Sequence, residues 1–164
     1  MLSLNDIAHV VLIGVGATAV MDIWLLMLLC LKAETPNFAL IGRWVGNLPS
    51  GRFAHASISK AQPIAGERGL GWFTHYAVGM AYACLLVGVQ GTEWSREPTL
   101  LSALVVGLVT VVVPLFVMQP AMGAGFASSK TPTPLKNCLR SLANHAAFGT
   151  GLYLAALFIQ WISR

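Results

Sequence analysis

Residues 7–31, IAHVVLIGVGATAVMDIWLLMLLCL, form an apolar run that only His9 and Asp22 interrupt with strongly polar groups. An α-helix rises about 1.5 Å per residue, so about 20 residues cross a hydrocarbon core about 30 Å thick. The run is therefore long enough for a membrane-spanning helix. It is not typical of a cleaved signal peptide, because it lacks a basic leading segment and exceeds the apolar length of roughly 7–15 residues found there.

Three further apolar runs have the length of a membrane span, at residues 71–90, 99–118 and 141–162. In the whole chain 56% of residues are hydrophobic and 10% are charged, and the mean hydropathy is +0.71. Soluble domains carry about 25% charged residues, so this chain has too few charges to cover a water-soluble surface. We predict an all-α membrane protein, with residues 1–164 forming one domain of four bundled transmembrane helices and the lipid bilayer as its surroundings.

The basic residues predict how the chain is oriented. Segments 32–70 and 119–140 carry eight of the ten Lys and Arg residues, namely Lys32, Arg43, Arg52, Lys60, Arg68, Lys130, Lys136 and Arg140. The opposite side carries Arg96 and Arg164. Lys and Arg accumulate on the cytoplasmic side, so we expect both segments to be cytoplasmic and both termini to lie outside. The thin spread of these charges does not favour a nucleic-acid partner, which requires a clustered basic face.

A short amphipathic helix is predicted within the first cytoplasmic segment, at residues 37–48. Arg43 lies on one side of this helix, and its other side is apolar, with Ile41, Trp44, Val45 and Leu48. Such a helix beside a span, carrying Trp, commonly lies in the headgroup region. Pro49 and Gly51 are expected to end it.

The two halves of the chain share several spacings. Lys60 precedes His75 by fifteen residues, and Lys130 precedes His145 by fifteen residues. Each histidine is followed four residues later by glycine and then by tyrosine. We predict that residues 7–90 and 99–162 are two copies of one hairpin, related by an axis normal to the membrane. Chance similarity between Gly- and Ala-rich spans is the alternative.

Several strings of the sequence resemble a known family. They are Gly42-Arg43-Trp44, Gly51-Arg52-Phe53-Ala54-His55, Gly71-Trp72-x2-His75-Tyr76-x2-Gly79 and His145-x2-Phe148-Gly149-x-Gly151-Leu152-Tyr153. Nearly the whole chain resembles the family of small bacterial inner-membrane proteins described as domain of unknown function 2938. The resemblance implies a bacterial inner-membrane location and a four-span fold. With the orientation predicted from the basic residues, both termini would then be periplasmic. It carries no known activity, cofactor or catalytic residue.

Asp22 is the only carboxylate inside a predicted span. An Asp at the centre of a membrane helix costs about 2.5–3.5 kcal/mol on insertion scales, so such residues usually face the bundle interior or a cavity. Gly14, Thr18 and Asp22 share one helix face. We predict a ligand- or ion-binding site at Asp22, with Thr18 and Tyr76 as further candidates. The alternative is a carboxylate that only accepts hydrogen bonds from a neighbouring Thr, Tyr or Trp.

His75 and His145 each lie four residues inside the predicted cytoplasmic end of a span, at a depth of roughly 6 Å. If the repeat is genuine they face each other, and such a pair is suited to a transition metal or to the two axial positions of a haem. The alternative is that each ring donates to a backbone carbonyl of the next helix. Asp22 is expected about 13 Å deep, in a separate layer. His9 and His55 are expected to be solvated or interfacial.

The sequence does not favour an enzyme. It contains no GxSxG, no HExxH and no Gly-rich phosphate loop. Its three cysteines, Cys30, Cys84 and Cys138, lack the spacing of a disulfide framework or a structural zinc site. No cofactor is required by the sequence, although the histidine pair keeps a haem or a transition metal open.

Three hypotheses for function remain. The first is a small transporter or ligand-binding membrane protein that uses Asp22 with His75 and His145. It leads because transport explains an intramembrane carboxylate better than haem ligation does. The second is a haem-binding redox subunit, and the third is a scaffold or accessory subunit. Small-residue helix faces, such as the one formed by Ala143, Ala147, Gly151 and Ala155, would serve the third and would also support a homodimer.

Overall fold

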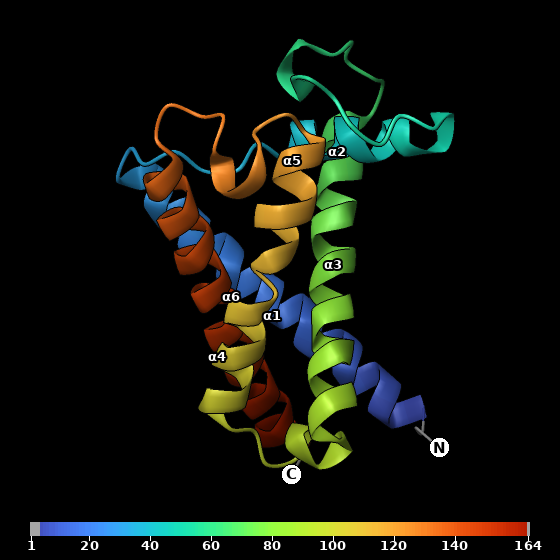
Figure 1. Cartoon of the computed structure of the whole chain (residues 1–164). Helices are drawn as coiled ribbons and strands as arrows, with labels where there is room; N and C mark the ends of the chain where they lie inside the picture. Colours follow the sequence, from blue (N-terminus) through green and yellow to red (C-terminus); the bar gives the residue numbers. More distant parts are fainter. Residues whose placement is uncertain (1–3, 164) are drawn as a thin grey trace. The chain divides into compact units, whose positions relative to one another are not determined.

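The structure is a computed structural model that describes residues 4–163, so Arg164 lies outside the described residues. In that range the chain is helical and has no strand (Figure 1). Four helical segments are long and apolar enough to cross a membrane: Leu4–Cys30 (α1), Glu67–Gln90 (α3), Leu100–Ala121 and Pro134–Ile162 (α6). The predicted all-α membrane fold with four spans is confirmed. Where the bilayer boundaries fall along these helices stays a prediction.

Helix α6 begins seven residues before the apolar run that predicted it. It starts at Pro134, and the carbonyl of Thr133 accepts a hydrogen bond from the Asn137 N–H at 3.1 Å. Proline suits the first position of a helix, because the N–H that it lacks would have no partner there. The start of α6 is therefore fixed by Pro134, ahead of the apolar run. Hydrophobicity alone predicts only the apolar part of the helix, from residue 141 onward.

The third long segment is not a continuous α-helix. It consists of α4 (Leu100–Val109), a turn, a π-helical stretch η4 (Pro114–Met118) and a last turn α5 (Gln119–Ala121). Pro114 has no N–H and cannot bond to the carbonyl of Thr110, which weakens the α-helical ladder at this point. Local π-helix inside a longer helix is rare and frequently marks a functional position.

The chain divides into two compact units. The first comprises Met1–Glu34, Tyr76–Thr110 and Asn144–Arg164, and the second comprises Thr35–His75 and Val111–Ala143. The hydrophobic core of the first unit includes Ile13, Leu86 and Leu152, which are fully buried. The short helix η3 (Thr92–Ser95) adds Trp94, which is also buried.

Glycines allow the helices of the first unit to pack closely. A Cβ atom added at Gly14 would lie 2.6 Å from the Cα of Met80, and one added at Gly151 would lie 2.7 Å from the carbonyl oxygen of Ala17. Gly107 and Gly149 make a comparable close contact between α4 and α6. Close backbone approach of this kind is the usual way in which membrane helices gain packing energy.

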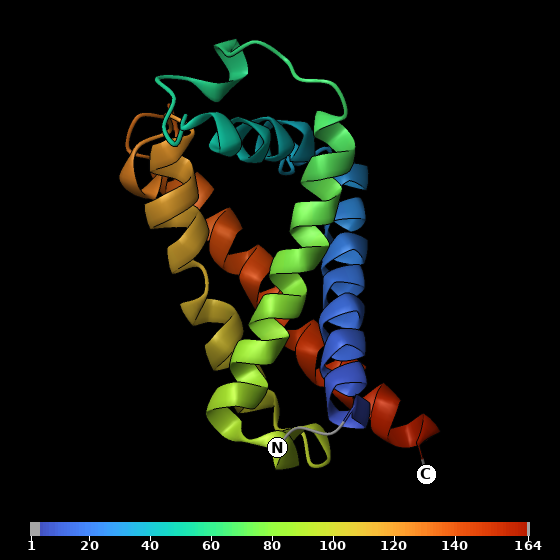
Figure 2. The ribbon, with the colours of Figure 1, turned by 90° about the vertical axis from the view of Figure 1, so that its right-hand side faces the viewer.

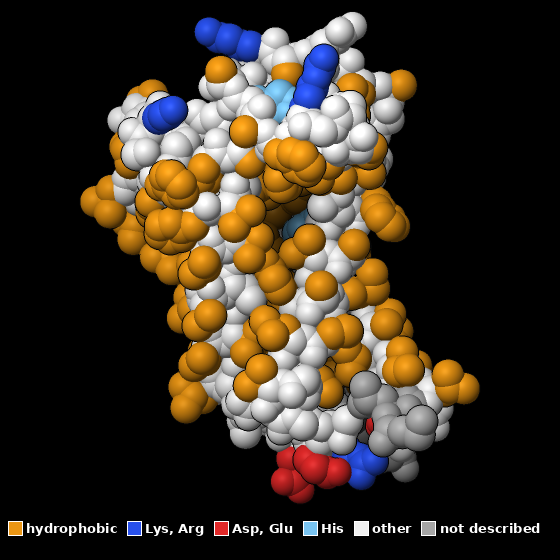
Figure 3. All heavy atoms as spheres, turned by 45° about the vertical axis from the view of Figure 1, so that its right-hand side comes forward, with side chains coloured by type: hydrophobic (Ala, Val, Ile, Leu, Met, Phe, Trp, Pro, Cys, Tyr) orange, Lys and Arg blue, Asp and Glu red, His pale blue; other side chains and the backbone are white. Residues whose placement is uncertain are grey.

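Large apolar side chains remain exposed along the outer faces of the helices. Examples, each at least 59% exposed, are Ile23, Leu26, Val89, Leu101 and Phe158. On the face drawn in Figure 3, hydrophobic side chains cover the helices. Soluble proteins rarely leave so much apolar surface in contact with solvent. The helices are therefore consistent with direct contact with lipid.

In the second unit the predicted amphipathic helix is present as α2 (Phe38–Asn47), and Asn37 caps it by accepting a hydrogen bond from the Ala39 N–H at 3.1 Å. Helix α2 crosses the first turns of α3 (Figure 2). A Cβ atom added at Gly42 would lie 1.8 Å from the carbonyl oxygen of Glu67, and one at Gly71 would lie 1.8 Å from that of Phe38. No residue larger than glycine fits this crossing without moving the two backbones apart.

The loops of the second unit are short helices joined by turns. They are η1 (Leu48–Ser50), η2 (Ile58–Lys60) and η5 (Phe126–Ser128). Two backbone hydrogen bonds link the loop that precedes α3 to the chain that follows η4. The His55 N–H donates to the Ala121 carbonyl at 2.8 Å, and the Ile58 N–H donates to the Met122 carbonyl at 3.0 Å. Gly123 has φ +92°, and a Cβ atom there would lie 2.3 Å from the carbonyl oxygen of Ala56. Glycine is thus required where these loops meet.

Candidate functional site

Two of the predicted site residues, Asp22 and Tyr76, are in contact within the first unit. The hydroxyl of Tyr76 donates a hydrogen bond to Oδ2 of Asp22 at 2.8 Å. Both side chains are half-buried. A phenol is a neutral donor, and it bonds to a carboxyl group whether that group is ionised or protonated. The contact therefore joins α1 to α3 through a side chain of each helix.

Thr18, the third candidate, is fully buried on the same helix. Its hydroxyl donates to the carbonyl of Gly14 at 2.8 Å, one turn earlier in α1. A Cβ atom added at Gly79 would lie 2.0 Å from the Thr18 hydroxyl oxygen, so Thr18 fills the space that this glycine leaves. Its donor is satisfied inside its own helix, which is common for threonine in membrane helices.

A second polar contact in the first unit was not predicted. The indole Nε1 of Trp24 donates to Oδ1 of Asn144 at 3.0 Å, and Asn144 is buried. Asn side chains commonly hold membrane helices together by such bonds. Its signal in the sequence was an amide near the start of the apolar run 141–162, next to His145.

His145 contacts the end of α4. Its Nδ1 lies 3.0 Å from the carbonyl oxygen of Gly107 and 3.2 Å from the hydroxyl oxygen of Thr110. The Thr110 hydroxyl donates to the same Gly107 carbonyl at 2.8 Å. These partners assign the proton to Nδ1, which then donates to Gly107 and leaves Nε2 as the ring nitrogen with a lone pair. This contact with a backbone carbonyl is the one expected if His145 fixes helix packing.

His75 lies in the second unit, among aromatic rings. Its ring centroid is 4.5 Å from that of Phe38 and 5.8 Å from that of Trp72. Among residues 4–163 no group of three or more His, Cys, Asp or Glu side chains is placed to hold a metal ion. A metal or haem site at His75 and His145 therefore stays a prediction, and these two histidines would be its protein ligands.

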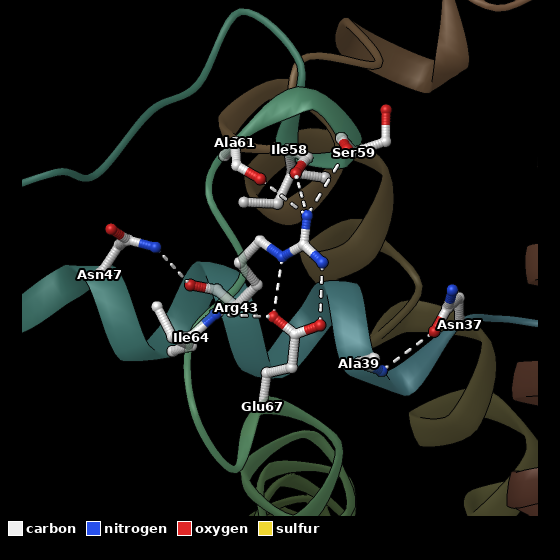
Figure 4. Close-up of polar contacts among 9 residues, drawn as sticks. All are labelled: Asn37, Ala39, Arg43, Asn47, Ile58, Ser59, Ala61, Ile64 and Glu67. Carbon is white, nitrogen blue, oxygen red and sulfur yellow. Dashed lines mark hydrogen bonds and ion pairs between the residues drawn. The ribbon is translucent and has the colours of Figure 1, made fainter.

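An ion pair in the second unit, between buried Arg43 and half-buried Glu67, was not predicted from the sequence (Figure 4). The guanidinium of Arg43 makes two parallel hydrogen bonds to the Glu67 carboxylate, from Nε to Oε2 and from NH2 to Oε1, both at 2.8 Å. The third nitrogen of Arg43 donates to the carbonyls of Ala61 at 2.9 Å and Ile58 at 3.2 Å. The hydrogen bond with Glu67 raises the pKa of Arg43, although burial opposes this effect. The guanidinium is therefore held in its charged form.

Glu67 completes the cluster. Its Oε2 also accepts a hydrogen bond from the Ile64 N–H at 3.1 Å, and its position in the first turn of α3 is favourable for a carboxylate. Arg43 and Glu67 together tie loop residues 58–64 to α2 and α3. From the sequence, Arg43 was used to predict the orientation of the chain and was placed on the polar side of an amphipathic helix. Its position beside Gly42, where two helices cross, was the available signal.

A pocket of about 290 Å³ lies beside this cluster, lined by Asn47, Arg52, His55, Ala61, Gln62, Pro63 and Ile64. His55, which was expected to be solvated or interfacial, lines this pocket. The residue is half-buried, and its Nδ1 is fully buried without a hydrogen-bond partner among the described residues. The backbone N–H of His55 donates to the Ala121 carbonyl, so the residue is held where the two loops meet.

Comparison with known proteins places the chain in a family. Residues 11–159 match the family model described as "Protein of unknown function (DUF2938)". No curated protein and no solved structure shows a match. The matched range includes Asp22, Tyr76, His145 and the Arg43–Glu67 cluster. The chain therefore belongs to the DUF2938 family of proteins of unknown function.

Proposed function

We propose that the protein is a small transporter or ion-binding membrane protein that uses the carboxylate of Asp22. The observation that supports this proposal is the 2.8 Å hydrogen bond from Tyr76 to Asp22, formed between two helices that are apolar enough to span a membrane. Carboxylates inside membrane segments are costly and usually mark ion or proton pathways. A neutral hydroxyl orients Asp22 and allows it to take up a proton or a small cation.

The test is ion movement into vesicles. The purified protein is reconstituted with an entrapped pH-sensitive dye, and proton entry is followed after a membrane potential is imposed. We expect flux with the wild type and its loss in Asp22→Asn, because an amide neither titrates nor supplies charge. Asp6→Asn is the matched control, since it removes a carboxylate from the first turn of the same helix. Flux equal to that of empty vesicles, or an Asp22→Asn protein as active as the wild type, contradicts the proposal.

A second candidate function is haem binding by His75 and His145. It is supported by the contact between Nδ1 of His145 and the Gly107 carbonyl, because haem- and metal-ligating histidines commonly anchor one ring nitrogen in this way and coordinate through the other. Absorption spectroscopy of the purified protein separates the two candidates. A Soret band that disappears in His145→Asn supports haem ligation, and a wild-type spectrum without one rejects it.

We also propose that the protein lies in a bacterial inner membrane, with residues 32–70 and 119–140 in the cytoplasm and both termini in the periplasm. The uneven distribution of Lys and Arg supports this orientation. Cysteine is introduced at Ser129, which is exposed, or at Arg164, in a variant without the native cysteines. We expect an impermeant thiol reagent added to whole cells to label the protein at 164 and not at 129. The reverse pattern contradicts the orientation.

The internal repeat is proposed on the shared spacings of residues 7–90 and 99–162. An experimental structure tests it directly. We expect the two hairpins to superimpose with His75 on His145. Histidines at unrelated depths or on unrelated helix faces would show that the similarity is due to chance.

A further inference from the structure

We propose that the pocket formed by the end of α2 and loop residues 52–64 binds a phosphate group, and this proposal is independent of the function proposed for Asp22. The pocket belongs to the loop that the Arg43–Glu67 cluster organises. Its polar lining comes from Arg52, His55, Gln62 and Asn47, and no Asp or Glu lines it. The polar groups are thus one cation, one imidazole and two amides, a set that favours an anion with several acceptor oxygens.

Two of these groups lack partners in the structure. The Arg52 side chain is exposed and makes no hydrogen bond or ion pair with another described residue. The Nδ1 of His55 is buried and unpaired in the same part of the chain. Buried polar atoms nearly always have a partner, so the unpaired Nδ1 leaves His55, a lining residue, with unused hydrogen-bonding capacity. A guanidinium matches phosphate oxygens through parallel hydrogen bonds.

The wall of the pocket is held rigidly. The carbonyl of Ala61, a lining residue, accepts a hydrogen bond from Arg43 at 2.9 Å, and the N–H of Ile64, another lining residue, donates to Glu67 at 3.1 Å. A preformed site loses less conformational freedom when a ligand binds. The volume of about 290 Å³ is at the lower limit for small-molecule sites, which suits a phosphate ester.

The phosphate has two sources, a phospholipid headgroup and a soluble phosphate ester. A lipid is favoured by the apolar surroundings of Arg52. Its neighbour Phe53 is 66% exposed, and the carbonyl of Phe53 accepts a hydrogen bond from the indole of Trp44 at 2.9 Å. Exposed aromatic side chains of this kind commonly lie at the level of the lipid headgroups.

Binding is measured on the full-length protein in detergent by native mass spectrometry, with phosphatidylglycerol, diacylglycerol or glycerol 3-phosphate as the added probe. We expect phosphatidylglycerol to bind and Arg52→Gln to weaken its binding by about tenfold, because a guanidinium–phosphate pair is lost. Lys60→Gln is the matched control, since Lys60 is an exposed cation of the same loop that does not line the pocket. His55→Gln is the second pocket variant, and we expect a smaller loss.

The outcomes separate the sources and test the proposal. Binding of phosphatidylglycerol alone identifies a lipid headgroup, and binding of glycerol 3-phosphate identifies a soluble ester. The proposal is overturned if neither phosphate probe binds, if diacylglycerol binds as tightly as phosphatidylglycerol, or if Lys60→Gln weakens binding as much as Arg52→Gln. Melting temperatures of the variants equal to that of the wild type show that each compared protein is folded.

Discussion

Glu67 and Asp22 are both carboxylates that bridge two helices, and they differ in the donors that hold them. Glu67 receives two charged N–H groups from Arg43 and a backbone N–H from Ile64. Asp22 receives the neutral hydroxyl of Tyr76. Charge-assisted bidentate bonds fix a carboxylate in its ionised form and in one geometry. The hydrogen bond from a phenol is weaker than such a charge-assisted pair, so we expect the two carboxylates to contribute differently to stability.

The largest effect is expected from breaking the Arg43–Glu67 cluster. Arg43→Met leaves the Glu67 carboxylate and two well-bonded loop carbonyls without their donor, and groups left unpaired in this way destabilise strongly. We expect the melting temperature in detergent to fall by several degrees. Arg52→Met is the matched control, because it removes an exposed cation from the loop that follows α2. An Arg43→Met protein as stable as this control would show that the cluster contributes little.

The second-largest effect is expected from a substitution that disturbs the close crossing of α2 and α3. Gly71→Ala places a Cβ atom 1.8 Å from the Phe38 carbonyl oxygen. We expect this overpacking to lower the free energy of unfolding by about 1–3 kcal/mol. Gly69→Ala, in the same helix with open space around it, should instead stabilise the protein by up to about 1 kcal/mol. Equal effects of the two substitutions in chemical denaturation would contradict the crossing geometry.

Combining Gly71→Ala with Arg43→Met sharpens this test. Both changes act on the contact between α2 and the first turns of α3, so we expect the double variant to lose less stability than the two single losses added together. Full additivity would show that helix spacing and the ion pair stabilise the protein independently.

The smallest effect is expected at the Asp22–Tyr76 pair. Tyr76→Phe removes one hydrogen bond, and such bonds between membrane helices contribute about 0.6 kcal/mol on average. Asp22→Asn keeps the volume and an acceptor oxygen, so its stability should be close to that of the wild type. Unfolding of the two single variants and the double variant in detergent gives the coupling between the residues. A loss at Asp22→Asn as large as that at Arg43→Met would show that Asp22 has a structural role.

The four spans could be predicted because length and hydrophobicity are local properties of the sequence. The amphipathic helix at Phe38–Asn47 could be predicted for the same reason, since its alternation of apolar and polar faces and its Asn37 cap are local features of the sequence. Arg43 and Glu67 are 24 residues apart and are joined across an irregular loop, so no periodic pattern relates them. The burial of His55 could not be predicted either, because it depends on a backbone bond to Ala121 in a distant loop. Proximity of Asp22 and Tyr76 required the packing of α1 against α3.

The sequence separation of the ion pair has a consequence for biosynthesis. Arg43 is translated 24 residues before Glu67, which at about 5–20 residues per second is a delay of roughly 1–5 s. During this interval the guanidinium has no carboxylate partner, and a free positive charge beside the first hydrophobic segment resists translocation. We expect Arg43 to help retain its loop on the side of the ribosome while the nascent chain inserts, and to close that loop only when the start of α3 has emerged.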